Sequence, residues 1–195
     1  MIKHLKQLDK KEPDLLVAVD TNDAPIGLVG SGKCHSPRGV LHRAYTVLIF
    51  NKKGELLIAR RSKYKKLWPL YWESSCSSHP RKKNELYAQA AQRRLREELG
   101  FSVPLMLYAK FVYYASDGRR GSEREVCALL TGTFGGKVRP NRSEVSEWKW
   151  IKIEKLLKDA KRKGSLYAPW LKIALQIWLH YPPSKNAIFH ADFYN

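Results

Sequence analysis

Short apolar runs separated by polar turns predict a protein dominated by β-strands. Branched aliphatic residues are abundant in LLVAVD, AYTVLIF and ELLIAR. The segment NKKG separates the last two of these runs, and its Asn and Gly are typical of a hairpin turn. A further short strand is expected after a turn at residues 21–24. Later strands are expected in LMLYAKFVYYAS, REVCALLTGTF and WKWI. The chain therefore carries enough strand-forming segments for one large sheet.

One segment in the middle of the chain has helical periodicity instead. Asn84 is a suitable N-cap, Glu85 suits a first turn, and Gly100 stands where a left-handed C-cap is expected. Arg94 and Glu98, four residues apart, would share one side. The expected core positions are Leu86, Ala90, Ala91, Leu95 and Leu99. Periodicity alone fits either a solvated, ion-paired face or a functional helix.

Two more helices are expected near the end, in IEKLLKDAKRK and at residues 170–180. With strands outnumbering helices, the natural arrangement is an α+β fold in which a mixed sheet packs against helices. A length of 195 residues suits a single domain over residues 1–195, with residues 1–14 as a loosely attached, charged arm. We expect neither a transmembrane helix nor a signal peptide, because no long apolar run occurs.

Charge is the most unusual feature of the composition. Thirty-six Lys and Arg against 18 Asp and Glu give a formal net charge of +18, which favours anionic partners such as nucleic acid, an acidic membrane or a phosphorylated small molecule. The basic clusters are scattered and no RNA-binding motif accompanies them, so a nucleic-acid-binding function is not favoured. Three cysteines without CxxC spacing indicate reduced thiols and a cytoplasmic protein.

Five residues distributed along the chain have the chemistry of metal ligands. They are His35, His42, His79, Glu123 and Glu125. Residues i and i+2 on a strand face the same side, so the two glutamates can converge on one ion. Such a set would suit Mn²⁺, Mg²⁺ or Zn²⁺, although any one of these histidines alone is more often structural.

The helix and its preceding loop resemble a known motif. At matching spacing, His79, Glu85, Arg93, Glu97, Glu98 and Gly100 resemble the Nudix box. Two positions depart from it, because His79 replaces the first glycine and Arg94 replaces a glutamate. The histidine, together with WPLYW, SSHP, LHRAYTVLIFN, the ExE before VC and a late PW, resembles type-I isopentenyl diphosphate isomerase over residues 17–178. The resemblance implies a Nudix-like mixed β-sheet packed between helices.

The same resemblance implies roles for individual residues. It assigns a buried divalent metal site to His35, His42, His79, Glu123 and Glu125. Glu98 would hold a Mg²⁺ that bridges to the substrate diphosphate. The basic groups that would grip this diphosphate are Arg61, Lys65, Arg94 and, less well aligned, Lys33. Tyr113 and Trp170 would lie near the reacting carbons, and an aromatic face can stabilise a carbocation by cation–π attraction.

The resemblance also implies the proton transfers, with Glu125 and Tyr113 on one side of the substrate and a cysteine on the other. Alignment of Trp72 and His79 puts Ser77, not Cys76, at the cysteine position. A serine hydroxyl needs an activating base where a thiol does not, and in an extended segment Cys76 would point to the opposite face.

The expected function is isomerisation of isopentenyl diphosphate to dimethylallyl diphosphate. Ser77 at the cysteine position allows for an activity lower than that of family members with a cysteine there. The alternative is a Nudix-type, Mg²⁺-dependent diphosphatase acting on a small nucleotide or prenyl diphosphate. Glu97 and Glu98 favour the alternative slightly, whereas Arg94 counts against it because a cation replaces one usual metal ligand. In either case the expected partner is a small-molecule diphosphate, with no membrane partner.

Overall fold

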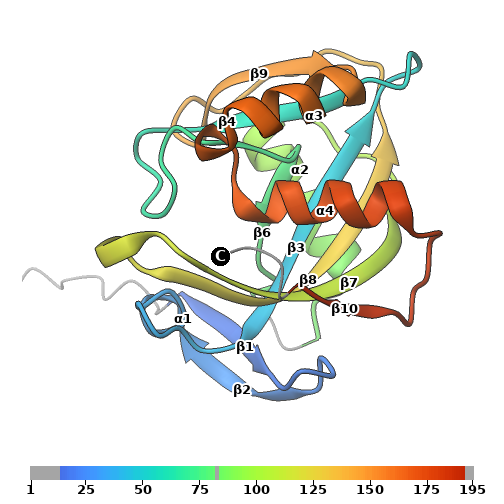
Figure 1. The fold of residues 1–195 in the computed structure, drawn as a ribbon. Coiled ribbons are helices and arrows are strands. Elements are labelled where there is room, and N and C mark those ends of the chain that lie inside the picture. Colours follow the sequence, from blue (N-terminus) through green and yellow to red (C-terminus); the bar gives the residue numbers. More distant parts are fainter. Residues whose placement is uncertain (1–13, 82–83, 192–195) are drawn as a thin grey trace, which may run out of the picture.

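A computed structural model describes residues 14–81 and 84–191 of the chain. Within these residues, ten strands form one curled sheet (Figure 1). The strands are β1 (Leu15–Val19), β2 (Pro25–Gly30), β3 (His42–Phe50), β4 (Leu56–Arg61), β5 (Trp72–Glu73), β6 (Cys76–Ser78), β7 (Met106–Ser116), β8 (Ser122–Thr133), β9 (Val145–Ile151) and β10 (Ile188–His190). The helices are α1 (Ser31–Cys34), α2 (Tyr87–Leu99), α3 (Ile153–Arg162) and α4 (Pro169–His180), with short 3₁₀ turns at Gly118–Arg120 and Gly164–Leu166.

Strand β3 is the organising strand of the sheet. It pairs in parallel with β8 along its whole length and antiparallel with the short strand β6, while β4 continues the sheet toward β5 and β9. Parallel and antiparallel pairs thus occur together, which makes the sheet mixed. Because side chains alternate along a strand, residues that are paired across β3, β6 and β8 point to the same face of the sheet.

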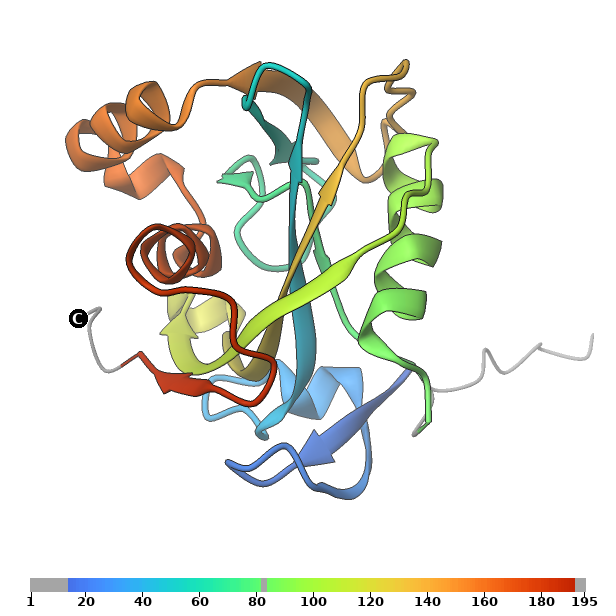
Figure 2. The ribbon, with the colours of Figure 1, turned by 90° about the vertical axis from the view of Figure 1, so that its right-hand side faces the viewer.

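Helices cover both faces of this sheet. Figure 2 shows α2 on one side and α3 and α4 on the other. The apolar core beneath α2 includes Tyr45, Val47 and Leu95, and the core beneath α4 includes Leu48, Phe111 and Leu171. The expected α+β architecture, a mixed sheet packed between helices, is therefore confirmed.

The predicted strands are confirmed, but the start of α2 was predicted wrongly. The helix begins at Tyr87 with Leu86 as its extended N-cap, not at Asn84. Glu85 lies before the helix, where its carboxylate accepts hydrogen bonds from the Arg81 backbone N–H at 2.7 Å and from Arg93 Nε at 3.2 Å. Leu86 is 64% exposed and does not belong to the core.

The predicted end of α2 is confirmed. Gly100 has φ 76°, and a Cβ there would lie 2.9 Å from the backbone oxygen of Arg139, so glycine fits both the dihedral and the close approach. The predicted core positions Ala90, Ala91, Leu95 and Leu99 are all buried. Four elements, α1, β5, β6 and β10, were not predicted. The proposed arm at residues 1–14 lies outside the described residues except for Asp14.

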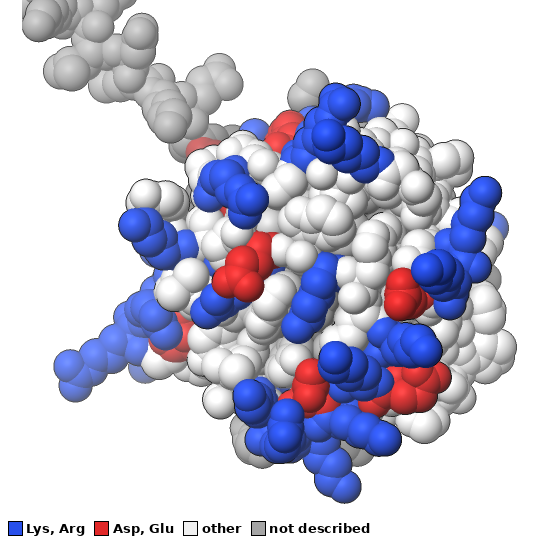
Figure 3. Space-filling view, turned by 90° about the horizontal axis from the view of Figure 1, so that it is seen from above, with Lys and Arg blue, Asp and Glu red and all other residues white. Residues whose placement is uncertain are grey.

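The basic surface is divided into separate groups. Figure 3 shows Lys and Arg side chains spread over the face seen from above, with Asp and Glu between several of them. On α3, for example, Arg162 pairs with Asp159 at 3.4 Å. Within the described residues, no helix has the length and apolar character needed to cross a membrane.

The β1–β2 turn is tied to the rest of the fold by one buried carboxylate. Asp23 Oδ1 accepts hydrogen bonds from Arg43 Nε at 2.6 Å and Tyr87 Oη at 2.9 Å, and its Oδ2 lies 2.5 Å from Lys110 Nζ. Asp23 has φ 67°, a conformation that asparagine also tolerates. The carboxylate thus joins the turn to β3, β7 and α2.

Replacement of Asp23 by asparagine is expected to lower the free energy of unfolding by roughly 2–3 kcal/mol, because two cations lose a partly buried counter-charge. Urea denaturation measures this change. Glu154→Gln, at an exposed position on α3, is the matched control and is expected to change stability by less than about 0.5 kcal/mol. Equal stability of both variants would contradict a structural role for this carboxylate.

Candidate active site and metal centre

A cavity of about 260 Å³ opens between the sheet and the start of α4. It gathers most of the residues singled out in the sequence, including His35, Arg61, Lys65, Ser77, His79, Tyr113, Glu123, Glu125 and Trp170. These residues come from β4, β6, β7, β8, α4 and the loops between elements, with His35 directly after α1. Lys33, by contrast, is exposed on α1 and is not among the lining residues.

Three histidines and a glutamate converge at one end of this cavity. The ring centroids of His35, His42 and His79 lie 4.9 to 5.0 Å from one another. One ligand atom from each histidine and from Glu123 lies within 4.8 Å of all the others. Pairing of β3 with β8 sets His42 beside Glu125, the fifth predicted ligand. The strand register thus brings together residues that are up to 90 positions apart in sequence.

The polar atoms in this cluster fit a divalent cation. His42 Nδ1 donates to the Val40 carbonyl at 2.7 Å, and this directs the Nε2 lone pair into the cluster. In the described part of the chain, the buried His42 Nε2 has no hydrogen-bond partner, and His35 Nε2 and Glu123 Oε2 have only each other, at 3.2 Å. Burial lowers the pKa of His42 to about 3 and that of His79 to about 4, so both imidazoles are neutral, as metal ligands must be.

Glu125 carries a second contact that points into the cavity. Its Oε2 accepts a hydrogen bond from Tyr113 Oη at 2.7 Å, while its Oε1 lies 3.0 Å from His79 Nε2. Burial raises the pKa of Glu125, opposed by the Tyr113 hydrogen bond. Burial and the neighbouring Glu125 raise the pKa of Tyr113 well above its usual value, so the phenol stays protonated. The hydrogen-bonded pair can therefore share a proton between the phenol and the carboxylate.

Ser77 and Cys76 face opposite sides of the sheet, as predicted. Ser77 lines the cavity, and its hydroxyl lies 2.7 Å from Ser74 Oγ and 3.0 Å from Thr46 Oγ1. Cys76 is fully buried in the core beneath α2, and its thiol contacts Glu98 Oε2 at 3.7 Å. Burial raises the pKa of the Cys76 thiol well above its usual range. Cys76 is therefore not placed to act on a ligand in the cavity.

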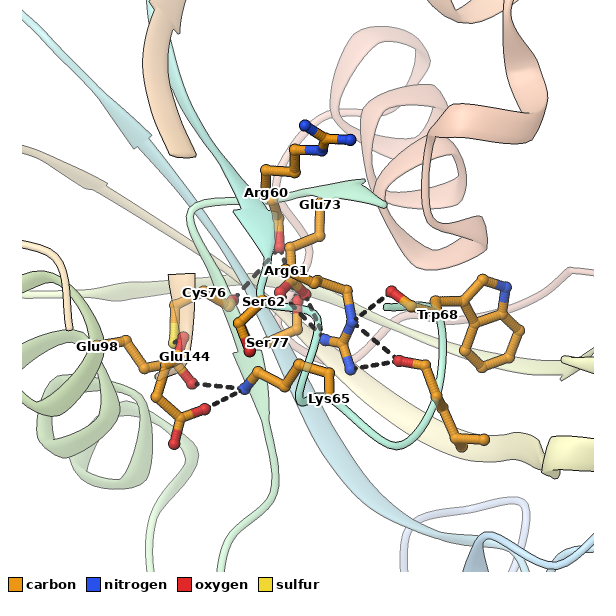
Figure 4. A network of polar contacts seen from close by, with 12 residues as sticks. Arg60, Arg61, Ser62, Lys65, Trp68, Glu73, Cys76, Ser77, Glu98 and Glu144 are labelled. Carbon is orange, nitrogen blue, oxygen red and sulfur yellow. Dashed lines mark hydrogen bonds and ion pairs between the residues drawn. The ribbon is translucent and has the colours of Figure 1, made fainter. Parts of the chain in front are cut away.

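A second polar network lies where α2 approaches β6 (Figure 4). Lys65 Nζ lies 3.4 Å from Glu98 Oε1 and also pairs with Glu144. Arg94 pairs with Glu98, with Glu97 at 2.7 Å and with Glu144 at 3.3 Å. Lys65, Arg94 and the predicted Mg²⁺ ligand Glu98 thus form one cluster. A bound anion could replace the carboxylates as the partner of the two basic groups, and a bound cation could replace the basic groups as the partner of Glu98. Sequence reasoning did not find Glu144, which arrives from the loop before β9.

Arg61 is engaged by the protein itself. Its Nε donates to the backbone carbonyls of Leu67 and Trp68, each at 3.1 Å, and its Nη1 lies 3.1 Å from both oxygens of Glu73. The guanidinium carbon lies 5.2 Å from the ring centroid of Trp170. Arg61 therefore orders the loop at residues 62–71 as well as lining the cavity.

Two further residues near the cavity were not found from the sequence. Glu73 lies within WESSCSSHP, but its charge gave no sign that it would be buried. Cys127 follows Glu125 by two positions, so β-strand alternation could have placed it on the same face; it is buried and lines the cavity. Cys34, beside His35, contacts the Val29 carbonyl at 3.9 Å and does not belong to the histidine cluster.

Comparison with known proteins matches this architecture. A NUDIX domain family model matches residues 40–171. The structure is similar to DR0079 from Deinococcus radiodurans, with a TM-score of 0.66 and 19% identity over 83% of this chain and 98% of that one. It is also similar to the MutT protein from Methanosarcina mazei Go1, with a TM-score of 0.58 and 18% identity over 72% of this chain and 92% of that chain. These similarities show the fold.

Curated relatives are more similar in sequence. Isopentenyl-diphosphate Delta-isomerase 2 of Photorhabdus laumondii is 37% identical over 159 residues, covering 82% of this chain and 89% of the relative. Isopentenyl-diphosphate Delta-isomerase 2 of Aromatoleum aromaticum is 35% identical over 162 residues, covering 83% and 85%. With both proteins matched over most of their lengths, the chain belongs to the isopentenyl-diphosphate Delta-isomerase family of NUDIX-domain proteins.

Proposed function

We propose that the protein converts isopentenyl diphosphate into dimethylallyl diphosphate. One observation carries the proposal beyond family membership. A single cavity holds the Glu125–Tyr113 proton-exchanging pair, the aromatic face of Trp170 and the hydroxyl of Ser77, with Arg61 and Lys65 beside them. Acid–base groups, an aromatic wall and cations are what isomerisation of an alkenyl diphosphate requires.

The proposed reaction begins with proton delivery by the Glu125–Tyr113 pair. Protonation of the terminal alkene carbon forms a new C–H bond and leaves a tertiary carbocation at the adjacent carbon. The indole face of Trp170 would stabilise this charge by cation–π attraction. Loss of a proton from the neighbouring methylene, on the side of Ser77, then forms the new double bond. The reaction requires that water be kept from the cation, because water would otherwise add to it.

The diphosphate would be held by Lys65, Arg94 and Arg61, with Glu98 as a ligand of Mg²⁺. The five-residue cluster around His42 would hold a second divalent ion, Mn²⁺, Mg²⁺ or Zn²⁺, which would supply positive charge near Glu125 and lower its proton affinity. We assign Lys33 only an outer role in attracting the diphosphate, because it is exposed on α1. A cytoplasmic location fits three free, buried cysteines.

Incubation of the purified protein with isopentenyl diphosphate and Mg²⁺ tests the proposal. Dimethylallyl diphosphate, identified by NMR, is the expected product. The alternative, a diphosphatase, predicts release of phosphate and a prenyl alcohol or monophosphate. Arg94 counts against hydrolysis, since a cation stands where the Nudix box has a metal-binding glutamate. Phosphate release without isomerisation would reject the proposed function.

Ser77→Cys is expected to raise kcat about tenfold or more, because a thiol exchanges protons near neutrality far more readily than a hydroxyl. Cys76→Ser is the matched control and is expected to leave kcat within about twofold, since Cys76 faces the core beneath α2. Steady-state kinetics with the same substrate measures both. If Cys76→Ser abolished activity while Ser77→Cys changed nothing, the assignment of Ser77 to the reacting side would be wrong.

A further inference from the structure

A buried carboxylate lies directly behind the cavity. Glu73, on the two-residue strand β5, is 2% exposed and pairs with the middle of β4. A buried, ionised carboxylate is costly unless its oxygens are paired. Its partners therefore show what this charge does in the fold.

Glu73 contacts two groups of the proposed active site at once. Both of its oxygens lie 3.1 Å from Arg61 Nη1, and its Oε2 also accepts a hydrogen bond from the indole Nε1 of Trp170 at 3.3 Å. Figure 4 shows Arg61 between Glu73 and the loop carbonyl of Trp68. The carboxylate thus connects a cation of the diphosphate site to the aromatic wall.

The indole of Trp170 is fixed from several directions. Trp68 packs edge-on against it with centroids 5.3 Å apart, and the Arg61 guanidinium lies 5.2 Å from its centroid. The only hydrogen bond recorded for its N–H among the described residues is the one to Glu73. A hydrogen bond from the indole N–H to an anionic acceptor increases electron density on the ring, and a nearby negative charge favours positive charge at the ring face.

We propose that Glu73 is a positioning residue for isomerisation, which orients the Trp170 indole through its N–H and strengthens the attraction of the ring for the carbocation. Glu73 does not touch the substrate in this role. It acts through Trp170, and its negative charge is the property that matters.

Glu73→Gln tests the role of the charge, because glutamine keeps the shape and an oxygen acceptor but is neutral. We expect kcat to fall about tenfold while KM changes by less than about threefold, since Arg61 keeps its two carbonyl partners. Glu73→Asp keeps the charge and is expected to recover part of kcat. Glu147→Gln, whose carboxylate pairs with Arg60 at the exposed surface, is the matched control and should behave as wild type.

A double-mutant cycle separates positioning from a merely structural role. Trp170→Phe keeps an aromatic face but removes the N–H donor, so in that background Glu73→Gln should lower kcat by less than about twofold. An equal fold-change in both backgrounds, or wild-type kcat for Glu73→Gln, would overturn the inference. If the glutamine variant failed to fold, Glu73→Asp in the two backgrounds would give the same comparison.

The inference rests on the proposed isomerase function, and the two fail differently. Absence of dimethylallyl diphosphate with the wild-type protein would reject the proposed function itself. An active wild type whose Glu73 variants show no coupling to Trp170 would reject only the role of Glu73.

Discussion

Replacement of Glu125 by glutamine is expected to lower kcat for isomerisation about a thousandfold, because the variant cannot carry the proton that the alkene receives. The wild-type carboxylate accepts a hydrogen bond from Tyr113 at 2.7 Å, and burial raises its pKa, which favours the proton-bearing form. Glutamine occupies the same volume but has no proton to exchange. Substrate affinity should change far less, since the cations that face the diphosphate are untouched.

Tyr113→Phe provides the graded comparison. Loss of the phenol removes one hydrogen bond to Glu125 but leaves the carboxyl group, so kcat should fall by roughly tenfold to a hundredfold. Steady-state kinetics across pH 5 to 9 measures both variants, and elemental analysis excludes metal loss as the cause, since Glu125 also contacts His79. If Glu125→Gln retained kcat within about fivefold of wild type with its metal content intact, Glu125 would not be the proton carrier.

The features of the fold that could be predicted are those encoded locally. Strands β3, β4, β7 and β8 coincide with segments rich in apolar residues, and Gly100 marks the end of α2 through a dihedral that other residues rarely adopt. The start of α2 was missed because Glu85, which would favour a first helical turn, instead binds Arg81 and Arg93. A local signal was thus overridden by contacts that the fold provides.

The residues of the site likewise include some that local rules could place and others that only the folded chain brings together. Glu123 and Glu125 could be placed together because alternation on one strand requires it, and the same rule separates Ser77 from Cys76. Glu144 could not be predicted, because its contacts with Lys65 and Arg94 depend on how the loop before β9 passes α2. The convergence of three histidines was suggested only by family resemblance, since register between β3 and β8 is a property of the folded sheet.

His42→Ala is expected to remove the divalent ion from the cluster and to lower the melting temperature. His42 is fully buried, and its Nε2 lies 3.8 Å from a carboxylate oxygen of both Glu123 and Glu125. Without this imidazole the site loses a central ligand, and the two carboxylates lose a neighbour that helps to hold the ion against their mutual repulsion. A ligand bound at a thousand times its Kd stabilises the native state by about 4 kcal/mol, so the loss should be large.

Elemental analysis and thermal melts, with and without a chelator, measure this effect. The chelator should lower the melting temperature of the wild type toward that of His42→Ala and leave the variant almost unchanged, because only the wild type has a bound ion to lose. His180→Ala, at the exposed end of α4, is the matched control and should keep both the metal and the response to chelator. Equal metal content in His42→Ala and wild type would rule out the five-residue cluster as the binding site, whatever the effect on activity.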